Sequence, residues 1–429
     1  MKRLFYVILS IVAINSYGQN IYGTINSFDK YLVLSKYYFV ELQTVDTIHL
    51  QENNTFSYSL KNLNVGQYNL SNDNVNIDFI VDKDKKDIKI YYDPENVNSF
   101  RFLSSKPNED LLKFYKFYDI KFNAYDVLNT TLKYYPEKEE FYNQIVHKKE
   151  LLKQEINKRV DSINSLYNNY LINQIVNSYR LTDDKFIAKY NYDTIFAGTK
   201  ILGSKIFEHL NKYQTESQSY EERQKIMYQA VDDILNAFIS NPDMETKVAG
   251  FLIEQFQHYD LNLIVEYTAD KSIQLIDNKK ISKNLQEDYN WIKAIVNTKL
   301  NAQAPDFKMD KKHNFSDLKS KYKILIFWAS WCPHCEDFMH QFEQVDQNSL
   351  KDYKVVTYSL DFEKETWETK IKEFPKNWIN LCECKSEENV PDKYAIYATP
   401  TIFVLDSENK IIAKPMSFED LDKFISEHF

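Results

Sequence analysis

One segment constrains this chain more than any other: an apolar run that ends in two tryptophans and two cysteines. The run occupies residues 324–328, and Ala-Ser-Trp-Cys-Pro-His-Cys follows it at residues 329–335. A short apolar run fits a buried strand, and proline directly after the first cysteine suits the first turn of a helix. The segment therefore predicts a strand that leads into a helix, with Cys332 and Cys335 at the start of that helix.

The two cysteines at this position have a specific chemistry. Free backbone N–H groups and the positive end of the helix dipole stabilise an anion at a helix start, and such sites lower a cysteine pKa to roughly 3.5–7.5. A protonated His334 adds positive charge beside the sulfur. Cys335 lies three positions on, on the same helical face, so it can attack Cys332 once that sulfur is held in a mixed disulfide. The pattern predicts a redox-active dithiol.

The amino-terminal residues predict export. Lys2 and Arg3 precede an apolar run at residues 4–14, and small residues follow at Ser16 and Gly18. This is the pattern of a secretory signal peptide at residues 1–18, cleaved near Gly18-Gln19. The run is about half of the ~20 residues that a membrane-spanning helix needs, so an anchor is disfavoured. We expect a periplasmic protein, in a compartment that permits disulfide chemistry.

The rest of the chain divides by its hydrophobic period. At 429 residues it is long enough for several domains. Residues 19–106 show short alternating segments at 31–34, 55–60, 77–81 and 88–92, which predict a small β-sandwich or barrel. Residues 107–299 show apolar positions at three- and four-residue steps, which predict a helical domain. The clearest series is Phe141, Ile145, Leu152, Ile156, Val160, Ile163 and Leu166.

Residues 300–429 alternate between strand and helix patterns, which predicts an α/β domain. Expected strands are 324–328, 355–360 and 378–382, with a hairpin of 401–405 and 410–413. Expected helices are 332–345, 365–374 and 418–429. Asn409 is expected to adopt the left-handed conformation in the hairpin turn. The fold class is thus multidomain, with a C-terminal α/β domain preceded by an all-β domain and an all-α region.

Three motifs of the last domain together resemble the thioredoxin fold. They are Ala304-Pro-Asp-Phe307, Trp328-Ala-Ser-Trp-Cys-Pro-His-Cys335 and Ala398-Thr-Pro-Thr-Ile-Phe-Val-Leu-Asp406. More narrowly, the domain is similar to TlpA/ResA-like exported thiol–disulfide oxidoreductases, and the preceding regions are similar in layout to the extensions of larger TlpA-family members. The fold class expected for the domain is therefore thioredoxin-like.

The resemblance implies a role for each active-site residue. Cys332 is the nucleophile, and Cys335 resolves the mixed disulfide. Pro333 and His334, the two residues between the cysteines, support the active site. Pro400 is a cis proline that faces the disulfide, where Thr399 and its neighbours pair with bound substrate. Trp331 is the aromatic residue beside the sulfurs. No cofactor and no metal are implied.

The domain departs from the family where an acid assists proton transfer. Phe338 stands three positions after the second cysteine, where many members have an acidic residue, and His340 stands where many have proline. Ile326 occupies the position of the buried aspartate of thioredoxin. We expect Glu336, Asp337 or a water molecule to serve instead.

A second pair of cysteines, Cys382 and Cys384, lies near the end of the strand expected at 378–382. It can form a second redox pair that relays electrons to Cys332 and Cys335, or it can be inert or locally paired. A zinc site is disfavoured because a one-residue gap is awkward for a zinc ligand pair. Peroxidase chemistry is disfavoured. Peroxiredoxins need Thr or Ser three residues before the reactive cysteine, where this chain has Ala329, and Pro four residues before that, where it has Leu325.

The sequence thus predicts a protein-disulfide reductase. Its partners are a disulfide-bearing exported protein and a membrane-linked thiol reductant. The net charge of −9 and the lack of a long basic run argue against nucleic acid as a partner. Two alternatives stay open: a DsbA-like oxidase or isomerase, suggested by the Pro-His pair, and a partner-binding protein with a vestigial thioredoxin domain.

Overall fold

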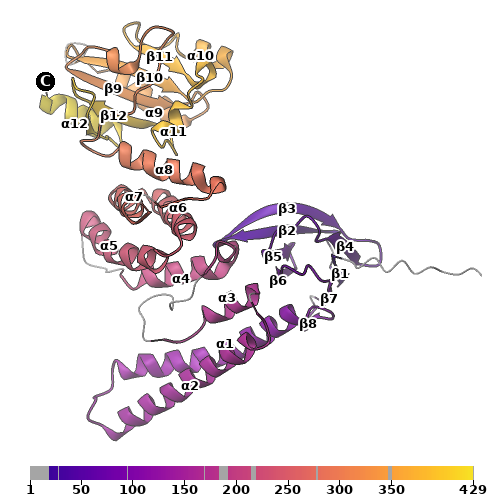
Figure 1. Cartoon of the computed structure of the whole chain (residues 1–429). Helices are drawn as coiled ribbons and strands as arrows, with labels where there is room; N and C mark the ends of the chain where they lie inside the picture. The colour runs from indigo at the N-terminus through magenta and orange to yellow at the C-terminus, as the bar shows by residue number, and fades with distance from the viewer. Residues whose placement is uncertain are drawn as a thin grey trace, which may run out of the picture. The chain divides into compact units, whose positions relative to one another are not determined.

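The structure is a computed structural model of the whole chain (Figure 1). It describes residues 19–27, 29–93, 95–168, 170–182, 192–213, 219–276, 279–345 and 350–428. The predicted signal peptide, residues 1–18, lies outside the described residues. The chain divides into two compact units, Met1–Gln214 and Thr215–Phe429. This division falls inside the expected helical region, and the boundaries expected near residues 106 and 299 stay predictions.

The first unit begins with two four-stranded sheets. Their strand orders are β4-β1-β7-β8 and β3-β2-β5-β6. Alternate side chains from both sheets share one apolar core, which includes Ile21, Leu34, Tyr68 and Ile90. The all-β region is therefore a sandwich, and each of the four predicted segments coincides with one of its strands to within one residue at either end or lies inside it. The strands are Asn20–Ile25 (β1), Tyr31–Tyr38 (β2), Glu41–His49 (β3), Thr55–Ser59 (β4), Gly66–Ser71 (β5), Asn76–Val81 (β6), Ile88–Asp93 (β7) and Asn96–Phe102 (β8).

Helices α1 to α4 belong to the same unit as the sandwich. In α2 the predicted positions Ile145, Leu152, Ile156, Val160 and Ile163 are buried. Phe141 of α2 and Leu166, two residues beyond its end, are exposed. The Asn108 side chain of α1 accepts from Ile80 N and donates to Ile80 O of β6, at 2.7 and 2.9 Å. This pairing attaches the helices to a sheet edge. The helices are Lys106–Leu132 (α1), Glu140–Asn164 (α2), Leu171–Asn177 (α3) and Lys200–Asn211 (α4).

The second unit begins with helices α5 to α8. Ser219 and Glu222 form a capping box at the start of α5, and the Asn241 side chain accepts from Met244 N at the start of α6. Lys414, beyond the last strand, forms an ion pair of 2.7 Å with Glu266 of α7, so these helices contact the α/β domain. The helices are Tyr220–Ala237 (α5), Pro242–His258 (α6), Asn262–Ile276 (α7) and Gln286–Asn297 (α8). The described residues contain no helix that is long and apolar enough to span a membrane.

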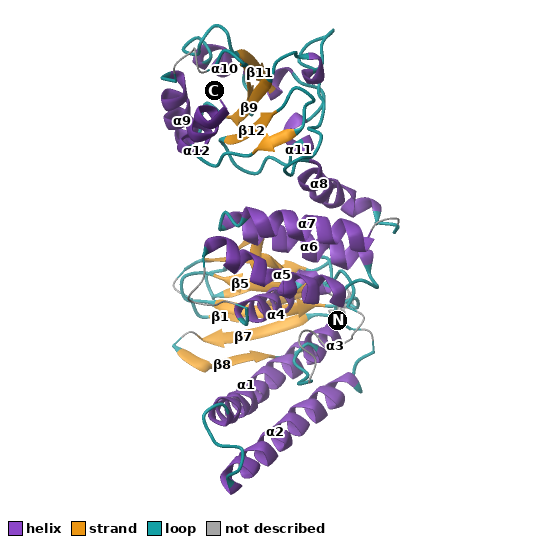
Figure 2. Cartoon of the chain, turned by 90° about the vertical axis from the view of Figure 1, so that its left-hand side faces the viewer, coloured by secondary structure: helices purple, strands orange, loops and turns teal. Residues whose placement is uncertain are grey.

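The α/β domain is built on a five-stranded sheet in the order β11-β10-β9-β12-β13. Strands β9, β10 and β11 are parallel, and β12 runs antiparallel to β9. Helices α9 and α12 lie together on one side of the sheet (Figure 2). The strands are Tyr322–Trp328 (β9), Tyr353–Ser359 (β10), Ile379–Cys382 (β11), Thr401–Leu405 (β12) and Ile411–Ala413 (β13), and the helices Pro333–Glu343 (α9), Lys364–Lys370 (α10), Val390–Lys393 (α11) and Phe418–His428 (α12).

The central strand β9 is buried on both faces, which explains its unbroken apolar run. Ile324, Ile326 and Trp328 belong to a core that includes α9 and α12. Leu325 and Phe327 belong to a second core on the other face. The strand is thus held from both sides, and its carboxyl end is fixed in space.

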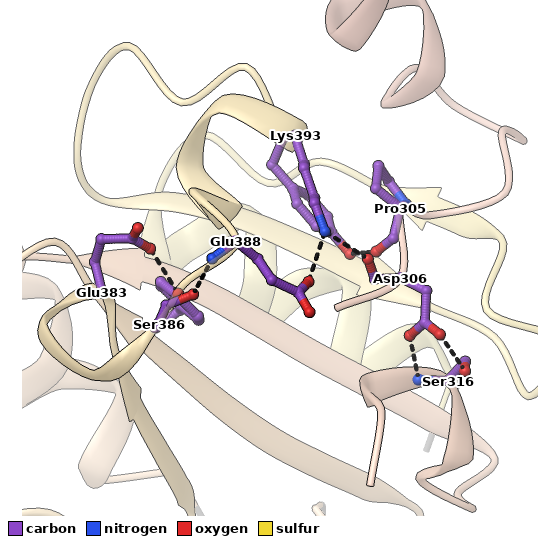
Figure 3. Close-up of polar contacts among 9 residues, drawn as sticks. Pro305, Asp306, Ser316, Glu383, Ser386, Glu388 and Lys393 are labelled. Carbon is purple, nitrogen blue, oxygen red and sulfur yellow. Dashed lines mark hydrogen bonds and ion pairs between the residues drawn. The ribbon is translucent and has the colours of Figure 1, made fainter. Parts of the chain in front are cut away.

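The Ala-Pro-Asp-Phe segment at residues 304–307 covers the second face of the sheet. Phe307 stacks on Phe315, with ring centroids 4.9 Å apart, and the Asp306 carboxylate accepts from the N–H and the hydroxyl of Ser316 (Figure 3). Lys393 of α11 pairs with Glu388 at 2.6 Å. Asn409 adopts φ = 66°, so the left-handed residue predicted for the hairpin is confirmed.

Candidate functional site: the dithiol at the start of α9

The turn between β9 and α9 places Cys332 at the carboxyl edge of the sheet. Cys332 is the residue before the first helical residue, Pro333, and its N–H donates to Ala329 O at 3.2 Å. Proline fits the first helical position because the N–H it lacks has no partner within the helix. The predicted order of strand, turn, cysteine and helix is confirmed.

Two backbone groups contact the Cys332 sulfur. The backbone N–H of Cys335 donates to Cys332 Sγ at 3.3 Å, and the Cys332 thiol donates to Thr399 O at 3.3 Å. Both cysteines are free thiols. Cys332 keeps 7% of its surface exposed and Cys335 keeps 1%, so a substrate reaches Cys332 first.

Burial makes the Cys335 thiol less acidic than an ordinary cysteine thiol. Desolvation by burial is the main cause that raises the pKa of Cys335 to about 12, and the hydrogen bond with Cys332 is the second largest. Cys335 is therefore a thiol rather than a thiolate at neutral pH. It needs a base, or contact with water, before it can act as a nucleophile.

The segment before β12 completes the site from the other side. Thr401 lies opposite Phe327 in the register of β12 and β9, so the two residues before Thr401 lie beside the end of β9. The peptide bond between Thr399 and Pro400 is cis, as the resemblance implied. The Thr399 carbonyl is the group that contacts the Cys332 thiol.

The remaining predicted residues surround this centre at the surface. Trp331 is 66% exposed, and Pro333 and His334 are also exposed. These residues are the sequence neighbours of Cys332 and lie at the surface beside it. Their predicted roles in substrate binding stay predictions.

The acids expected to replace the missing family acid lie at the surface. Glu336 and Asp337 are exposed, and Lys370 pairs with Glu336 at 2.9 Å, which lowers the pKa of Glu336. A small cavity of about 10 Å³ is lined by Cys332, Cys335 and Glu336, among others. That volume is close to what one water molecule requires. Of the three expected substitutes, Glu336 and a water molecule thus have a place beside the dithiol, because Glu336 lines the cavity and the cavity has room for one water molecule.

Asp361 is a site residue that the sequence analysis missed. It is 3% exposed, and its carboxylate accepts from the Ser330 N–H at 3.2 Å, the Ser330 hydroxyl at 2.7 Å and the Ser359 hydroxyl at 2.6 Å. Ser330 belongs to the turn that leads to Cys332, so Asp361 holds that turn. The available signal was a charged residue directly after the apolar strand 355–360, at the same sheet edge.

The second cysteine pair lies at the end of β11. Cys382 is the last residue of the strand, and its sulfur is bonded to that of Cys384. Across the sheet Cys382 lies opposite Ser359, which lies opposite Trp328. The predicted location near the end of the strand expected at 378–382 is therefore correct, and the two sulfurs are locally paired.

Comparison with known proteins finds relatives of the C-terminal part of the chain. Residues 320–411 match a family model described as thioredoxin-like. The thioredoxin-like protein YneN of Bacillus subtilis is 25% identical over 133 residues, which cover 30% of this chain and 76% of YneN. The thiol-disulfide oxidoreductase ResA of the same organism is 25% identical over 116 residues, or 26% of this chain and 64% of ResA. The chain therefore spans just under two thirds of the length of ResA.

Solved structures also align with this part. A domain of a possible thiol-disulfide isomerase from Cytophaga hutchinsonii is 29% identical, with a TM-score of 0.28, and the match covers 31% of this chain and 95% of that one. The match to the family model identifies the C-terminal part of this chain as a thioredoxin-like domain, which follows an all-β region and a helical region. The similarity of this part to ResA supports thiol–disulfide oxidoreductase chemistry at the level of the family.

Proposed function

We propose that this protein reduces disulfide bonds of exported proteins through Cys332 and Cys335. The observation that carries the proposal is the geometry at one sulfur. Cys332 Sγ receives an N–H from Cys335 and contacts the Thr399 carbonyl, while the resolving thiol is buried directly behind it. These two contacts fix the position of the sulfur that attacks the substrate disulfide.

The reaction proceeds by two thiol–disulfide exchanges. Cys332 as thiolate bonds to one sulfur of the substrate disulfide, and the other substrate sulfur leaves and takes a proton. Cys335 then loses its proton and attacks Cys332 Sγ, which releases the second substrate thiol and closes the Cys332–Cys335 bond. Two electrons and two protons pass to the substrate.

Each supporting group has a place in these steps. The backbone around Thr399 and Pro400 holds the substrate segment of the mixed disulfide, and exposed Trp331 adds apolar contact beside it. The small cavity at Cys335 admits the water molecule that takes the Cys335 proton. A membrane-linked dithiol reductant then reduces the closed bond and returns the enzyme to its starting state.

Export supports this choice of substrate and partner. The signal pattern at residues 1–18 predicts that the chain folds outside the cytoplasm, in the periplasm. Misoxidised exported proteins need a reductant in that compartment.

Trapping tests the proposal. In the full chain, Cys335→Ser is expected to accumulate its substrate protein as a mixed disulfide on Cys332, identified by mass spectrometry. The matched control is Cys332→Ser/Cys335→Ser, which should trap nothing. Adducts of equal yield in both variants would contradict the proposal.

The direction of electron flow is tested by equilibrium with glutathione. A reductase is expected to have a potential near that of thioredoxin, about −270 mV, rather than near the about −120 mV of DsbA. A value at the oxidising end would instead make the protein a disulfide oxidase, the alternative that Pro333 and His334 suggest.

A further inference from the structure

The disulfide between Cys382 and Cys384 shares a sheet edge with the dithiol. The register aligns Trp328, Ser359 and Cys382 across β9, β10 and β11. Neighbouring strands lie about 4.8 Å apart, so Cys382 is about 10 Å from the end of β9. Cys382 also belongs to the same apolar cluster as Cys332 and Cys335.

The two sulfurs of this disulfide differ in access. Cys382 is 4% exposed, whereas Cys384 is only partly buried, so an external thiolate reaches Cys384 first. Glu383, the residue between the two cysteines, is held in place because the Tyr358 hydroxyl donates to its carboxylate at 2.6 Å. Figure 3 shows Glu383 at this turn, near Ser386. The turn therefore has a fixed position that does not depend on the disulfide alone.

A structural role accounts poorly for this bond. The stabilisation that a disulfide supplies grows with the length of the loop it closes, and this loop contains one intervening residue. Cys382 is already held in the sheet by the pairing of β11 with β10. The bond therefore adds little to the fold, which leaves its redox chemistry as its distinctive property.

Asp361 connects the disulfide to the dithiol. Cys382 Sγ lies 3.3 Å from the Asp361 carbonyl oxygen, and the Asp361 carboxylate holds the N–H and hydroxyl of Ser330. Ser330 lies two residues before Cys332. A disulfide sulfur carries no proton, whereas a Cys382 thiol can donate to the Asp361 carbonyl, as the Cys332 thiol does to the Thr399 carbonyl.

We propose that Cys382–Cys384 is a second redox-active disulfide, opened by dithiol reductants, whose state alters the reactivity of Cys332 through Asp361. A reductant thiolate bonds to Cys384 Sγ, and Cys382 leaves as a thiolate and takes a proton. The second reductant thiol then attacks the mixed disulfide and releases the Cys384 thiol. Two electrons pass from the reductant, which ends as a disulfide. The effect on Cys332 rests on the proposed function, but the opening of the bond does not.

The first test measures reduction without the dithiol. The full chain carrying Cys332→Ser/Cys335→Ser is equilibrated with a series of dithiothreitol and glutathione buffers, and thiols at Cys382 and Cys384 are counted by alkylation and mass spectrometry. The matched variant, Cys382→Ser/Cys384→Ser, reports on the Cys332–Cys335 pair. The second disulfide is expected to open in buffers that also reduce the first. A bond that stays closed where the first pair is fully reduced overturns the proposal, and it leaves the proposed function intact.

The second test measures the connection through Asp361. Cys382→Ser/Cys384→Ser supplies a hydroxyl that can donate to the Asp361 carbonyl, and Cys382→Ala/Cys384→Ala supplies no donor. Iodoacetamide is expected to label Cys332 at rates that differ about fivefold between these variants, as expected for one hydrogen bond. Equal rates would overturn the connection. Because this readout is alkylation, it does not depend on finding the substrate.

Discussion

The two cysteine pairs of this protein lie at one edge of one sheet, yet the structure supports them differently. Cys332 precedes α9, a helix of 11 residues, and is a free thiol in contact with the Thr399 carbonyl. Cys382 ends the edge strand β11 and is bonded to its near neighbour Cys384. Two intervening residues on a helix keep Cys335 behind Cys332, whereas one intervening residue allows a local bond. The comparison shows that one sheet edge holds a pair of free thiols and a locally bonded pair, which differ in spacing and in the element that follows the first cysteine.

The largest expected contrast between the pairs is in catalysis. Cys332→Ser is expected to lower the rate of disulfide reduction by about a thousandfold or more, as for other removed nucleophiles. Cys382→Ser/Cys384→Ser is expected to change that rate by no more than about tenfold, the effect of losing a hydrogen bond near the site. The measurement is insulin reduction by the full chain. Similar losses in both variants would show that the pairs act as one unit.

The next contrast lies inside the first pair. Because burial raises the pKa of Cys335 to about 12, its thiolate fraction at neutral pH is about a thousandth of that of an ordinary thiol. Raising the pH toward 12 restores the thiolate, so iodoacetamide labelling of Cys335 in Cys332→Ser should keep rising beyond pH 9. Labelling of the same variant after denaturation is the control. A plateau near pH 9 in the folded chain would contradict the buried thiol.

Asp361 contacts Cys382 directly and Ser330, two residues before Cys332, so its substitution sharpens the comparison. Asp361→Ala leaves the Ser330 N–H without its partner, which is expected to cost roughly 1–3 kcal/mol of the free energy of unfolding. Asp361→Asn keeps an acceptor in the same place and is expected to cost less. Tryptophan fluorescence during urea unfolding measures this, since all five tryptophans lie in the second unit, Thr215–Phe429. Equal costs for the two variants would mean that Asp361 contributes by volume rather than by hydrogen bonding.

The smallest expected effect concerns the surface beside Cys332. Trp331 is 66% exposed, so Trp331→Ala is expected to change the free energy of unfolding by less than about 0.5 kcal/mol. Loss of its contact with substrate should still raise KM about threefold to tenfold, as for an aromatic contact at an interface. Steady-state kinetics with a protein disulfide substrate measures the change. Trp367→Ala, a buried control, should lower stability instead.

Local sequence patterns were sufficient for most elements of the α/β domain. The apolar run, Pro333 and the cysteine spacing correctly predicted strand, turn and helix at residues 322–343, because each depends on neighbours within a few positions. Period-two alternation likewise located four of the sandwich strands, β2, β4, β6 and β7. The motif at residues 398–406 supported a cis bond at Pro400, through resemblance rather than through any local physical signal.

Long-range arrangement is what local patterns could not supply. Asp361 lies 31 positions from Ser330, and only the pairing of β10 with β9 brings its carboxylate beneath the turn that holds Cys332. The attachment of α1 to the sandwich through Asn108 depends in the same way on a partner, Ile80, in another element. Period and propensity describe which face of a segment is apolar, but the partner of that face is decided by strand order and packing across the whole chain.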